Sequence, residues 1–118
     1  MSGDAEDTLR RFWAIQDDGD YARLATLFAQ DAELVDPVFG TFRGGEAIAG
    51  FMARMNDEMR KAGASFRLEE LAGDDHTAWA QWTATTSRGP RTGVGVYRVR
   101  DGRITYYRDY MDAPPTTK

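Results

Sequence analysis

The sequence contains no cysteine, which excludes disulfide bonds, thiolate catalysis and cysteine-ligated metals. It has a single histidine, His76, which argues against a histidine-based zinc site or a Ser-His-Asp triad on this chain. No stretch approaches the roughly 18 apolar residues of a membrane span. The acidic start "MSGDAEDTLRR" lacks the apolar segment of a signal peptide. We therefore expect a cytoplasmic protein with no membrane partner, no metal and no cofactor.

Clustered positive charge is also missing. The 15 lysines and arginines are dispersed and the formal net charge is -4, so we expect no nucleic-acid partner. A chain of 118 residues, 42% of them hydrophobic, is long enough to bury one core and short for two. We predict a single domain over residues 1–118, in which the tail "APPTTK" at 113–118 is frayed.

The first half of the chain is typical of helices. A helix is predicted over residues 4–18, and Asp20 is suited to cap a short second helix whose face carries Leu24, Leu27 and Phe28. Ala32 to Val35 predicts a short strand that ends before Pro37, and "FGTFRGG" favours a hairpin. A third helix is predicted up to Gly63, with an apolar stripe made of Ile48, Phe51, Met52, Met55 and Met59.

The second half changes to strand-like composition. Residues 66–71, 77–87, 92–100 and 103–112 are rich in β-branched and aromatic residues and are separated by "GDD", "RGP" and "DG". They predict consecutive antiparallel strands in a meander. Helices followed by strands indicate an α+β domain, with about three N-terminal helices on one face of a curved antiparallel sheet.

The last hairpin leaves two registers open. A two-residue turn at Asp101-Gly102 pairs Tyr97 with Tyr106, whereas a three-residue loop pairs Tyr97 with Thr105. A one-residue slip exchanges the two faces of a strand. In the second register the inner face holds Gly93, Gly95, Tyr97, Tyr107, Asp109 and Met111, and the outer face holds Val94, Val96, Ile104, Tyr106, Arg108 and Tyr110.

Two segments carry a family resemblance. The segment "DGDYARLATLFAQDAELVDPVFGTFRGGEAIAGFM" and the strand block that ends in "GVYRVRDGRITYYRDYMD" resemble the nuclear transport factor 2-like (NTF2-like, cystatin-like) superfamily in its SnoaL-like branch, over residues 6 to 112. The resemblance implies a cone-shaped α+β fold, in which three helices enclose a pocket against a bent sheet. It does not specify a reaction, because this superfamily includes isomerases, cyclases, hydrolases and non-catalytic binders.

When the sequence is aligned with three enzyme families of the superfamily, their catalytic carboxylates fall on aspartates of this chain. Similarity to ketosteroid isomerase puts the catalytic base on Asp36, while the two oxyanion donors fall on Phe12 and Gly95. Similarity to limonene epoxide hydrolase puts one catalytic aspartate on Asp109, while its arginine and second aspartate fall on Trp82 and Ala84. Similarity to SnoaL-type polyketide cyclases also implies an acid-base role for Asp109. The same alignment puts Asp109 inside the cone, which favours the three-residue loop.

Each carboxylate has a structural alternative. Asp36 precedes proline in "LVDPVFG", where an aspartate can simply start a turn; if apolar neighbours desolvate it, its pKa rises and it is suited to proton transfer. Asp109 is either an acid or base on the pocket floor, or a surface residue paired with an arginine. Two carboxylates in one cavity would repel each other and divide the acid and base roles.

These residues define a predicted site for a small hydrophobic molecule. Asp36, Asp109 and Tyr107 are the predicted catalytic residues, with Tyr97 and Tyr107 as alternative donors to a carbonyl oxygen. The predicted pocket lining is Phe12, Phe39, Phe51, Met55, Met59, Trp82, Gly93, Gly95, Tyr97 and Met111. We predict isomerase, cyclase or epoxide-hydrolase chemistry without a cofactor. The alternatives are a non-catalytic ligand-binding dimer and a protein-interaction module with a filled cone.

The predicted outer face of the sheet is too apolar to remain in water as one patch. It carries Trp79, Val94, Val96, Ile104, Tyr106 and Tyr110. We therefore predict a homodimer that is joined sheet to sheet through this face, and the family resemblance implies the same assembly.

Overall fold

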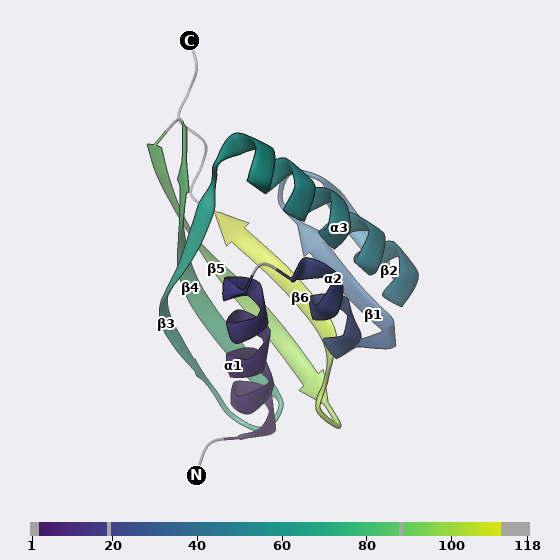
Figure 1. The fold of residues 1–118 in the computed structure, drawn as a ribbon. Helices are drawn as coiled ribbons and strands as arrows, with labels where there is room; N and C mark the ends of the chain where they lie inside the picture. The colour runs from purple at the N-terminus through teal and green to yellow at the C-terminus, as the bar shows by residue number, and fades with distance from the viewer. Residues whose placement is uncertain (1–2, 19, 88, 112–118) are drawn as a thin grey trace.

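The computed structural model describes residues 3–18, 20–87 and 89–111, and Figure 1 shows their arrangement. The α+β class predicted from the sequence is confirmed, while the predicted tail at 113–118 lies outside the described residues. The elements in chain order are α1 (Asp4–Asp17), α2 (Tyr21–Leu24), the 3-10 turn η1 (Ala25–Leu27), β1 (Phe28–Asp36), β2 (Gly40–Arg43), α3 (Gly45–Ala62), β3 (Ser65–Gly73), β4 (Thr77–Thr86), β5 (Gly89–Arg100) and β6 (Arg103–Met111).

The described strands form one curved sheet in the order β2-β1-β6-β5-β4-β3. Strands β3 to β6 pair as an antiparallel meander, as predicted. The prediction of a wholly antiparallel sheet is wrong at one place, because β1 lies parallel to β6. A parallel pair requires a long crossover connection. Helix α3 and the β3–β5 meander supply it, and they bring the last strand back beside the first.

Two full helices, α1 and α3, cover the same face of the sheet (Figure 1). Helix α1 packs on β3, β4 and β5, and α3 packs on β1 and β2. The prediction of about three helices overstates the second one, which is a single turn continued by η1, because Phe28 already begins β1. Asp20 caps it as predicted, with its Oδ1 accepting from the Arg23 backbone N–H at 3.2 Å. Gly63 ends α3 in a left-handed conformation, with φ 65°.

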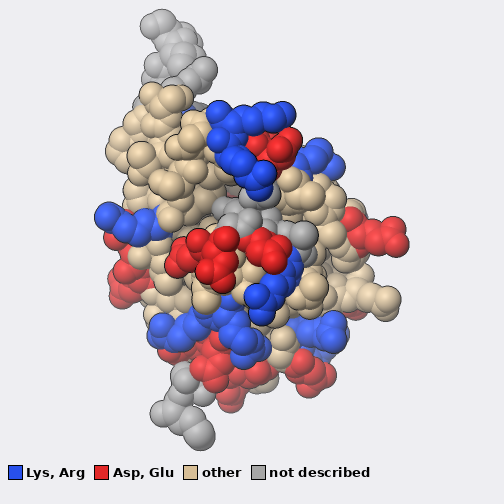
Figure 2. All heavy atoms as spheres, viewed as in Figure 1, with Lys and Arg blue, Asp and Glu red and all other residues tan. Residues whose placement is uncertain are grey.

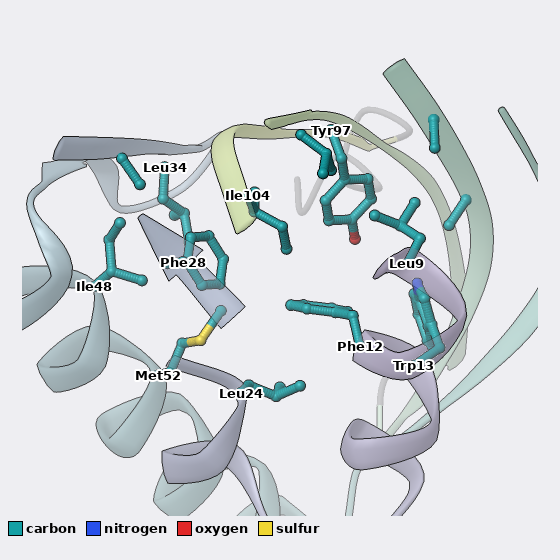
Figure 3. Close-up of a cluster of buried hydrophobic side chains, with 14 of the residues drawn as sticks. Leu9, Phe12, Trp13, Leu24, Phe28, Leu34, Ile48, Met52, Tyr97 and Ile104 are labelled. Carbon is teal, nitrogen blue, oxygen red and sulfur yellow. The ribbon is translucent and has the colours of Figure 1, made fainter. Parts of the chain in front are cut away.

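The core lies between the helices and the inner face of the sheet, and it includes side chains from α1, α3, β1, β4, β5 and β6 (Figure 3). Every second residue of β4 is buried, and three of these residues are alanines, so α1 can approach the sheet closely. From α1, Phe12 makes edge-to-face contacts with Trp13, Phe28, Tyr97 and Tyr107, at centroid distances of 5.5 to 6.4 Å. These contacts fix the helix over the two strands that carry the tyrosines.

The β5–β6 hairpin combines features of both predicted registers. Asp101 and Gly102 form a two-residue turn with positive φ angles of 54° and 74°, the conformation that Asp-Gly turns favour. An irregularity then shifts the register, because Thr105 is an extra residue on β6. Tyr97 consequently pairs with Tyr107, and both predicted pairings of Tyr97 are wrong.

The extra residue also decides which side chains point inward. It exchanges the faces of β6 beyond the turn, so the inner face contains the side chains of Tyr97, Tyr107 and Asp109, as the second register predicted. Ile104 precedes the shift and is fully buried in the core, which corrects its predicted place on the outer face.

Charged side chains of both signs are interspersed on the face shown in Figure 2, and neither sign forms a continuous patch there. The ion pairs are mostly local, such as Arg10 with Glu6 at 2.7 Å and Lys61 with Asp57 at 3.3 Å, each one helical turn apart. Exposed pairs of this kind contribute little to stability. None of the helices in the described part of the chain is long and apolar enough to cross a membrane.

Candidate functional site

A cavity of about 160 Å³ lies between the helices and the inner face of the sheet. A volume near 150 Å³ is about that of a cavity that holds one benzene ring. The lining comes from α1, from β1 and the turn after it, from α3, and from strands β3, β4 and β6. Its members are Trp13, Gln16, Leu34, Asp36, Val38, Phe39, Phe51, Met55, Met59, Phe66, Trp82, Tyr107, Asp109 and Met111. Most are apolar or aromatic, which suits a small apolar ligand.

Asp109 supplies the cavity's inner carboxyl group from β6. Its Oδ2 accepts a hydrogen bond from the Tyr107 hydroxyl at 2.7 Å, whereas its Oδ1 is buried without a hydrogen-bond partner among the described residues. The pKa of Asp109 is raised from 3.8 to about 7, mainly because the group is buried. The hydrogen bond from Tyr107 lowers this pKa, the charge of Asp36 raises it and the Trp82 indole lowers it. A neutral carboxyl group avoids the cost of an unpaired buried charge, so Asp109 holds its proton up to near-neutral pH.

Two stacked tyrosines hold this carboxyl group in place. The rings of Tyr97 and Tyr107 lie 4.3 Å apart at an interplanar angle of 14°. Burial, and then the charge of Asp109, raise the pKa of both hydroxyl groups well above the ordinary range. Both hydroxyls therefore keep their protons across the physiological pH range, and the Tyr107 hydroxyl donates a hydrogen bond to Asp109.

Two glycines of β5 make room for these groups. A Cβ atom at Gly95 would lie 2.9 Å from the Tyr97 hydroxyl oxygen and 3.0 Å from Asp109 Oδ1, and a Cβ atom at Gly93 would overlap the Trp82 ring. Real Cβ atoms rarely come so close to other heavy atoms. The missing side chain at Gly93 thus leaves room for the Trp82 ring. The missing side chain at Gly95 leaves room for the Tyr97 hydroxyl and the Asp109 carboxyl group.

The position of Asp36 explains how it meets Asp109. In the parallel β1–β6 pair, Leu34 pairs with Tyr107 and Val35 with Arg108. The next step along both strands brings Asp36 beside Asp109, on the face that Leu34 and Tyr107 share. Neighbouring parallel strands lie roughly 5 Å apart, so each carboxylate is within reach of the other's charge.

Asp36 also has the structural role that the sequence analysis gave as the alternative to a catalytic one, because it stabilises the turn after β1. Its Oδ1 accepts hydrogen bonds from the backbone N–H groups of Val38 at 2.8 Å and Phe39 at 3.0 Å. Both hypotheses about its position therefore agree with the geometry, because the residue shapes the turn and lines the cavity. The turn exposes two large apolar side chains at the cavity rim, Val38 at 65% and Phe39 at 58%.

Two further buried polar atoms belong to Trp13, which lines the cavity, and to Tyr97, which lies behind its wall. The indole nitrogen of Trp13 and the hydroxyl of Tyr97 have no hydrogen-bond partner among the described residues, and Figure 3 shows the Trp13 nitrogen turned toward Tyr97. With Tyr107 and Asp109 these two residues form a polar cluster, which is enclosed by the apolar core.

The sequence matches the SnoaL-like domain family over residues 9–107. The chain belongs to the SnoaL-like family. No match was found among proteins with curated functions. The SnoaL-like domain is also similar to solved structures. An NTF2-like protein of unknown function from Mesorhizobium loti shares 24% identity and a TM-score of 0.80, covering 93% of this chain and 92% of that one.

Two other structures extend the likeness. A protein from Kribbella flavida has 23% identity and a TM-score of 0.77 over 92% of this chain and 86% of its own. A protein of unknown function with a cystatin-like fold from Methylobium petroleophilum has 19% identity and a TM-score of 0.77, covering 97% of this chain and 79% of that one. Likeness at this level of identity supports the NTF2-like and cystatin-like fold alone.

Most residues predicted for the pocket line the cavity of this SnoaL-like domain. They are Asp36, Asp109, Tyr107, Phe39, Phe51, Met55, Met59, Trp82 and Met111. Four predicted lining residues lie outside the lining: Phe12, Gly93, Gly95 and Tyr97. Phe12 and Tyr97 are fully buried in the core, and the two glycines have no side chain to project into the cavity. The catalytic roles assigned to Asp36, Asp109 and Tyr107 stay predictions.

The sequence analysis of the SnoaL-like domain missed five lining residues: Trp13, Gln16, Leu34, Val38 and Phe66. One of them had a usable signal, because Leu34 precedes Asp36 by two residues and so shares its strand face. Gln16 follows Trp13 by three residues and shares its helix face, but Trp13 was itself not predicted to line the pocket. Gln16 adds an amide group to a wall that is otherwise mostly apolar.

Proposed function

We propose that this protein catalyses cofactor-free proton transfer on a small apolar molecule that carries a carbonyl group, in the manner of an isomerase or a cyclase. The supporting observation is that two carboxyl groups, from Asp36 and Asp109, line one cavity whose other walls are mostly apolar. Epoxide hydrolysis is less well supported. The β4 positions where polar groups would hold a water contain Trp82 and Ala84.

The two carboxyl groups have environments suited to different roles. Asp36 is held by two backbone N–H groups that donate to its Oδ1, which leaves Oδ2 to take a proton. Asp109 is surrounded by apolar and aromatic groups and has a raised pKa of about 7, so it enters the reaction protonated. Neighbouring carboxyl groups in different protonation states are a common arrangement for acid-base catalysis.

The proposed reaction balances without a cofactor. The Asp36 carboxylate removes a proton from the carbon next to the carbonyl group, and the C–H electron pair forms a C=C bond to the carbonyl carbon. The carbonyl oxygen gains negative charge and receives a hydrogen bond or proton from Asp109. In a substrate with a C=C bond between its β and γ carbons, Asp36 then returns its proton to the γ carbon. The electron pair of that C=C bond forms the new C–H bond, the enolate pair moves between the α and β carbons, the carbonyl group re-forms and Asp109 recovers its own proton. The product is an isomer of the substrate, and both side chains end in their starting states.

The pH profile tests these roles. We use 3-cyclohexen-1-one, a one-ring ketone of suitable size, and follow the ultraviolet absorption of the conjugated product. The rate is expected to be constant between about pH 5 and 6 and to fall roughly tenfold per pH unit above about 7, because Asp109 loses its proton there. A rate that rises through pH 7, or no catalysis above buffer, would contradict the assignment. Asp101→Asn, in the β5–β6 turn, is the control and should leave the profile unchanged.

A non-catalytic ligand-binding domain is the second candidate. It is favoured by the turn-forming hydrogen bonds of Asp36, which give this carboxylate a complete structural role. A binder should keep its ligand affinity in both Asp36→Asn and Asp109→Asn and show no turnover. The third candidate, a protein-interaction module, predicts a filled interior, which the observed cavity does not favour.

The proposed assembly is a homodimer joined through the outer sheet face. Trp79, Val94, Val96 and Tyr106 are partly exposed there, and Tyr110 is 50% exposed. We expect light scattering at micromolar concentration to give about twice the chain mass of 13.2 kDa, and Val96→Asp to give a monomer because it places a charge in the buried interface. A monomeric wild-type protein under these conditions overturns the assembly.

A further inference from the structure

A second groove lies on the outer side of the cavity wall, between the β1–β2 hairpin and α3. Its volume is about 450 Å³. Its apolar lining is Phe39, Phe42, Phe51 and Met55. Phe42 stacks on Phe51 at 4.3 Å, and Phe39 lies 5.8 Å from Phe51, both measured between ring centroids. The groove therefore has an aromatic floor that is already ordered.

The groove adjoins the cavity. Phe39, Phe51 and Met55 line both, so a single layer of side chains separates the two spaces. Val38 and Phe39 stand at the rim with more than half of their surface exposed. Exposed apolar side chains grouped beside a cavity are typical of a surface that a ligand covers.

The size of the cavity bears on what the groove holds. About 160 Å³ accommodates a molecule of one ring, and a larger apolar molecule must extend past the rim. The groove is the apolar surface that adjoins this exit. A ligand whose ring end reached Asp109 would lay its remaining part over Val38 and Phe39 and onto the floor beside Phe42.

The charges at the groove indicate a neutral occupant. Its α3 side carries Arg54, Asp57 and Glu58, and Asp57 is already paired with Lys61 at 3.3 Å. Both signs are present on an exposed rim, so attraction and repulsion of a charged ligand group largely offset each other and the rim selects neither sign. The apolar floor of the groove is therefore the feature that can bind a ligand, and it favours an uncharged apolar group.

We propose that this groove binds the uncharged apolar tail of the molecule whose ring end occupies the cavity, so the ligand is a one-ring compound with an alkyl or alkenyl extension. This inference rests on the proposed function only in placing the carbonyl-bearing ring at Asp109. It adds a second subsite and limits the substrate class to tailed, neutral, monocyclic molecules.

Binding of a series of 4-alkylphenols tests the subsite. Phenol is a neutral one-ring mimic of an enol, and its para position carries a tail from methyl to hexyl. Calorimetry on the wild-type protein should give one molecule per chain, with affinity rising roughly two- to fourfold per added carbon, and therefore at least about sixtyfold from phenol to 4-hexylphenol. A flat series, in which hexylphenol binds no more tightly than phenol, overturns the proposal.

Two variants locate the tail. Phe42→Thr removes the groove floor without removing a residue of the cavity lining, and Glu58→Trp fills the groove from an exposed position on α3. Each is expected to lower hexylphenol affinity about tenfold while phenol affinity stays within about twofold. Arg60→Trp, at an exposed position on α3 that lines neither the groove nor the cavity, is the matched control for Glu58→Trp and should alter neither affinity. If a folded Glu58→Trp variant shows the same increase in affinity from phenol to 4-hexylphenol as the wild type, the tail does not lie in this groove.

The outcomes for the groove and for the function are separable. If the alkylphenol series is flat but 3-cyclohexen-1-one gives the expected pH profile, the tail-binding role of the groove is wrong and the acid-base function stands. A tail-dependent series with no isomerisation at any pH removes the function and leaves the groove as a binding site.

Discussion

Asp109→Asn is expected to lower the rate of 3-cyclohexen-1-one isomerisation by roughly 10²- to 10⁴-fold, the range that a general acid contributes. Asparagine has nearly the same shape and can still accept the hydrogen bond that Tyr107 donates at 2.7 Å, but it cannot transfer a proton. The KM should change little because the cavity walls are preserved. Steady-state kinetics at about pH 6 provides the measurement, and Asp101→Asn is the matched carboxylate control.

The same substitution should stabilise the protein at high pH. The folded chain holds the Asp109 proton up to about pH 7, and the unfolded chain loses it near 3.8. Between these values the folded state binds more protons, so the free energy of unfolding of the wild type falls as pH rises from about 4 to 7 and is then constant. A pKa shift of this size corresponds to about 4 kcal/mol of unfolding free energy.

Asp109→Asn removes this loss of stability, because asparagine has no proton to release. Urea unfolding at about pH 9 should therefore show the variant to be more stable than the wild type, and at about pH 4 the two should be similar. Lower activity together with higher stability separates a functional carboxyl group from a structural one. An Asp109→Asn variant that is less stable than the wild type at pH 9, or fully active, contradicts both the burial and the role of this residue.

Gly93→Ala is expected to destabilise the fold by about 1–3 kcal/mol. A Cβ atom at this position would overlap the ring of Trp82, and the ring is 4% exposed and packs edge-on against Phe66 at 5.4 Å. Relief requires the indole to move, which changes the cavity wall beside Asp109. Urea unfolding reports the stability, and tryptophan fluorescence and near-ultraviolet circular dichroism report the displaced ring.

Gly50→Ala provides the control for this substitution. Gly50 lies in α3, and the nearest atom to an added Cβ is the Arg54 Nη1 at 3.7 Å, an ordinary contact. Alanine favours the helix, so this variant should gain about 0.5–1 kcal/mol. If Gly93→Ala behaved like Gly50→Ala, with unchanged fluorescence, Trp82 would not occupy the position described.

The fold was largely predictable because its signals are local. Acidic first turns, the Asp20 cap and the glycine after α3 mark helix ends, and period-two patterns mark β4 to β6. The parallel β1–β6 pair was not predictable in this way. It depends on where the last strand returns, and no residue in either strand encodes that choice by its own propensity.

The faces of β6 show a second limit. Asp101-Gly102 correctly indicated a two-residue turn, and the family alignment correctly put Asp109 inside, yet these two statements conflict in a regular ladder. The extra residue Thr105 reconciles them. Threonine carries no signal for such an irregularity, so the sequence alone left both registers open and misplaced Ile104.

The candidate site was predictable where one side chain belongs to a recognisable pattern. Asp36 stood out between apolar neighbours before proline, and the methionines of α3 followed a helical stripe. Gln16 and Phe66 were missed because their place in the cavity depends on how α1 and β3 pack across the sheet. The environment of Asp109 likewise arises from residues distant in sequence, since Tyr107 is near but Trp82 and Asp36 are not.

The central claim is that Asp109 is a buried, protonated acid beside Asp36. A ¹³C NMR titration of aspartate carboxyl groups, with the Asp109 resonance assigned by its loss in Asp109→Asn, measures this directly. We predict a titration midpoint near pH 7 in the wild type, and a lower one in Asp36→Asn because the charge of Asp36 raises the pKa of Asp109. A midpoint near 3.8 in the wild type, unchanged in Asp36→Asn, would contradict the account.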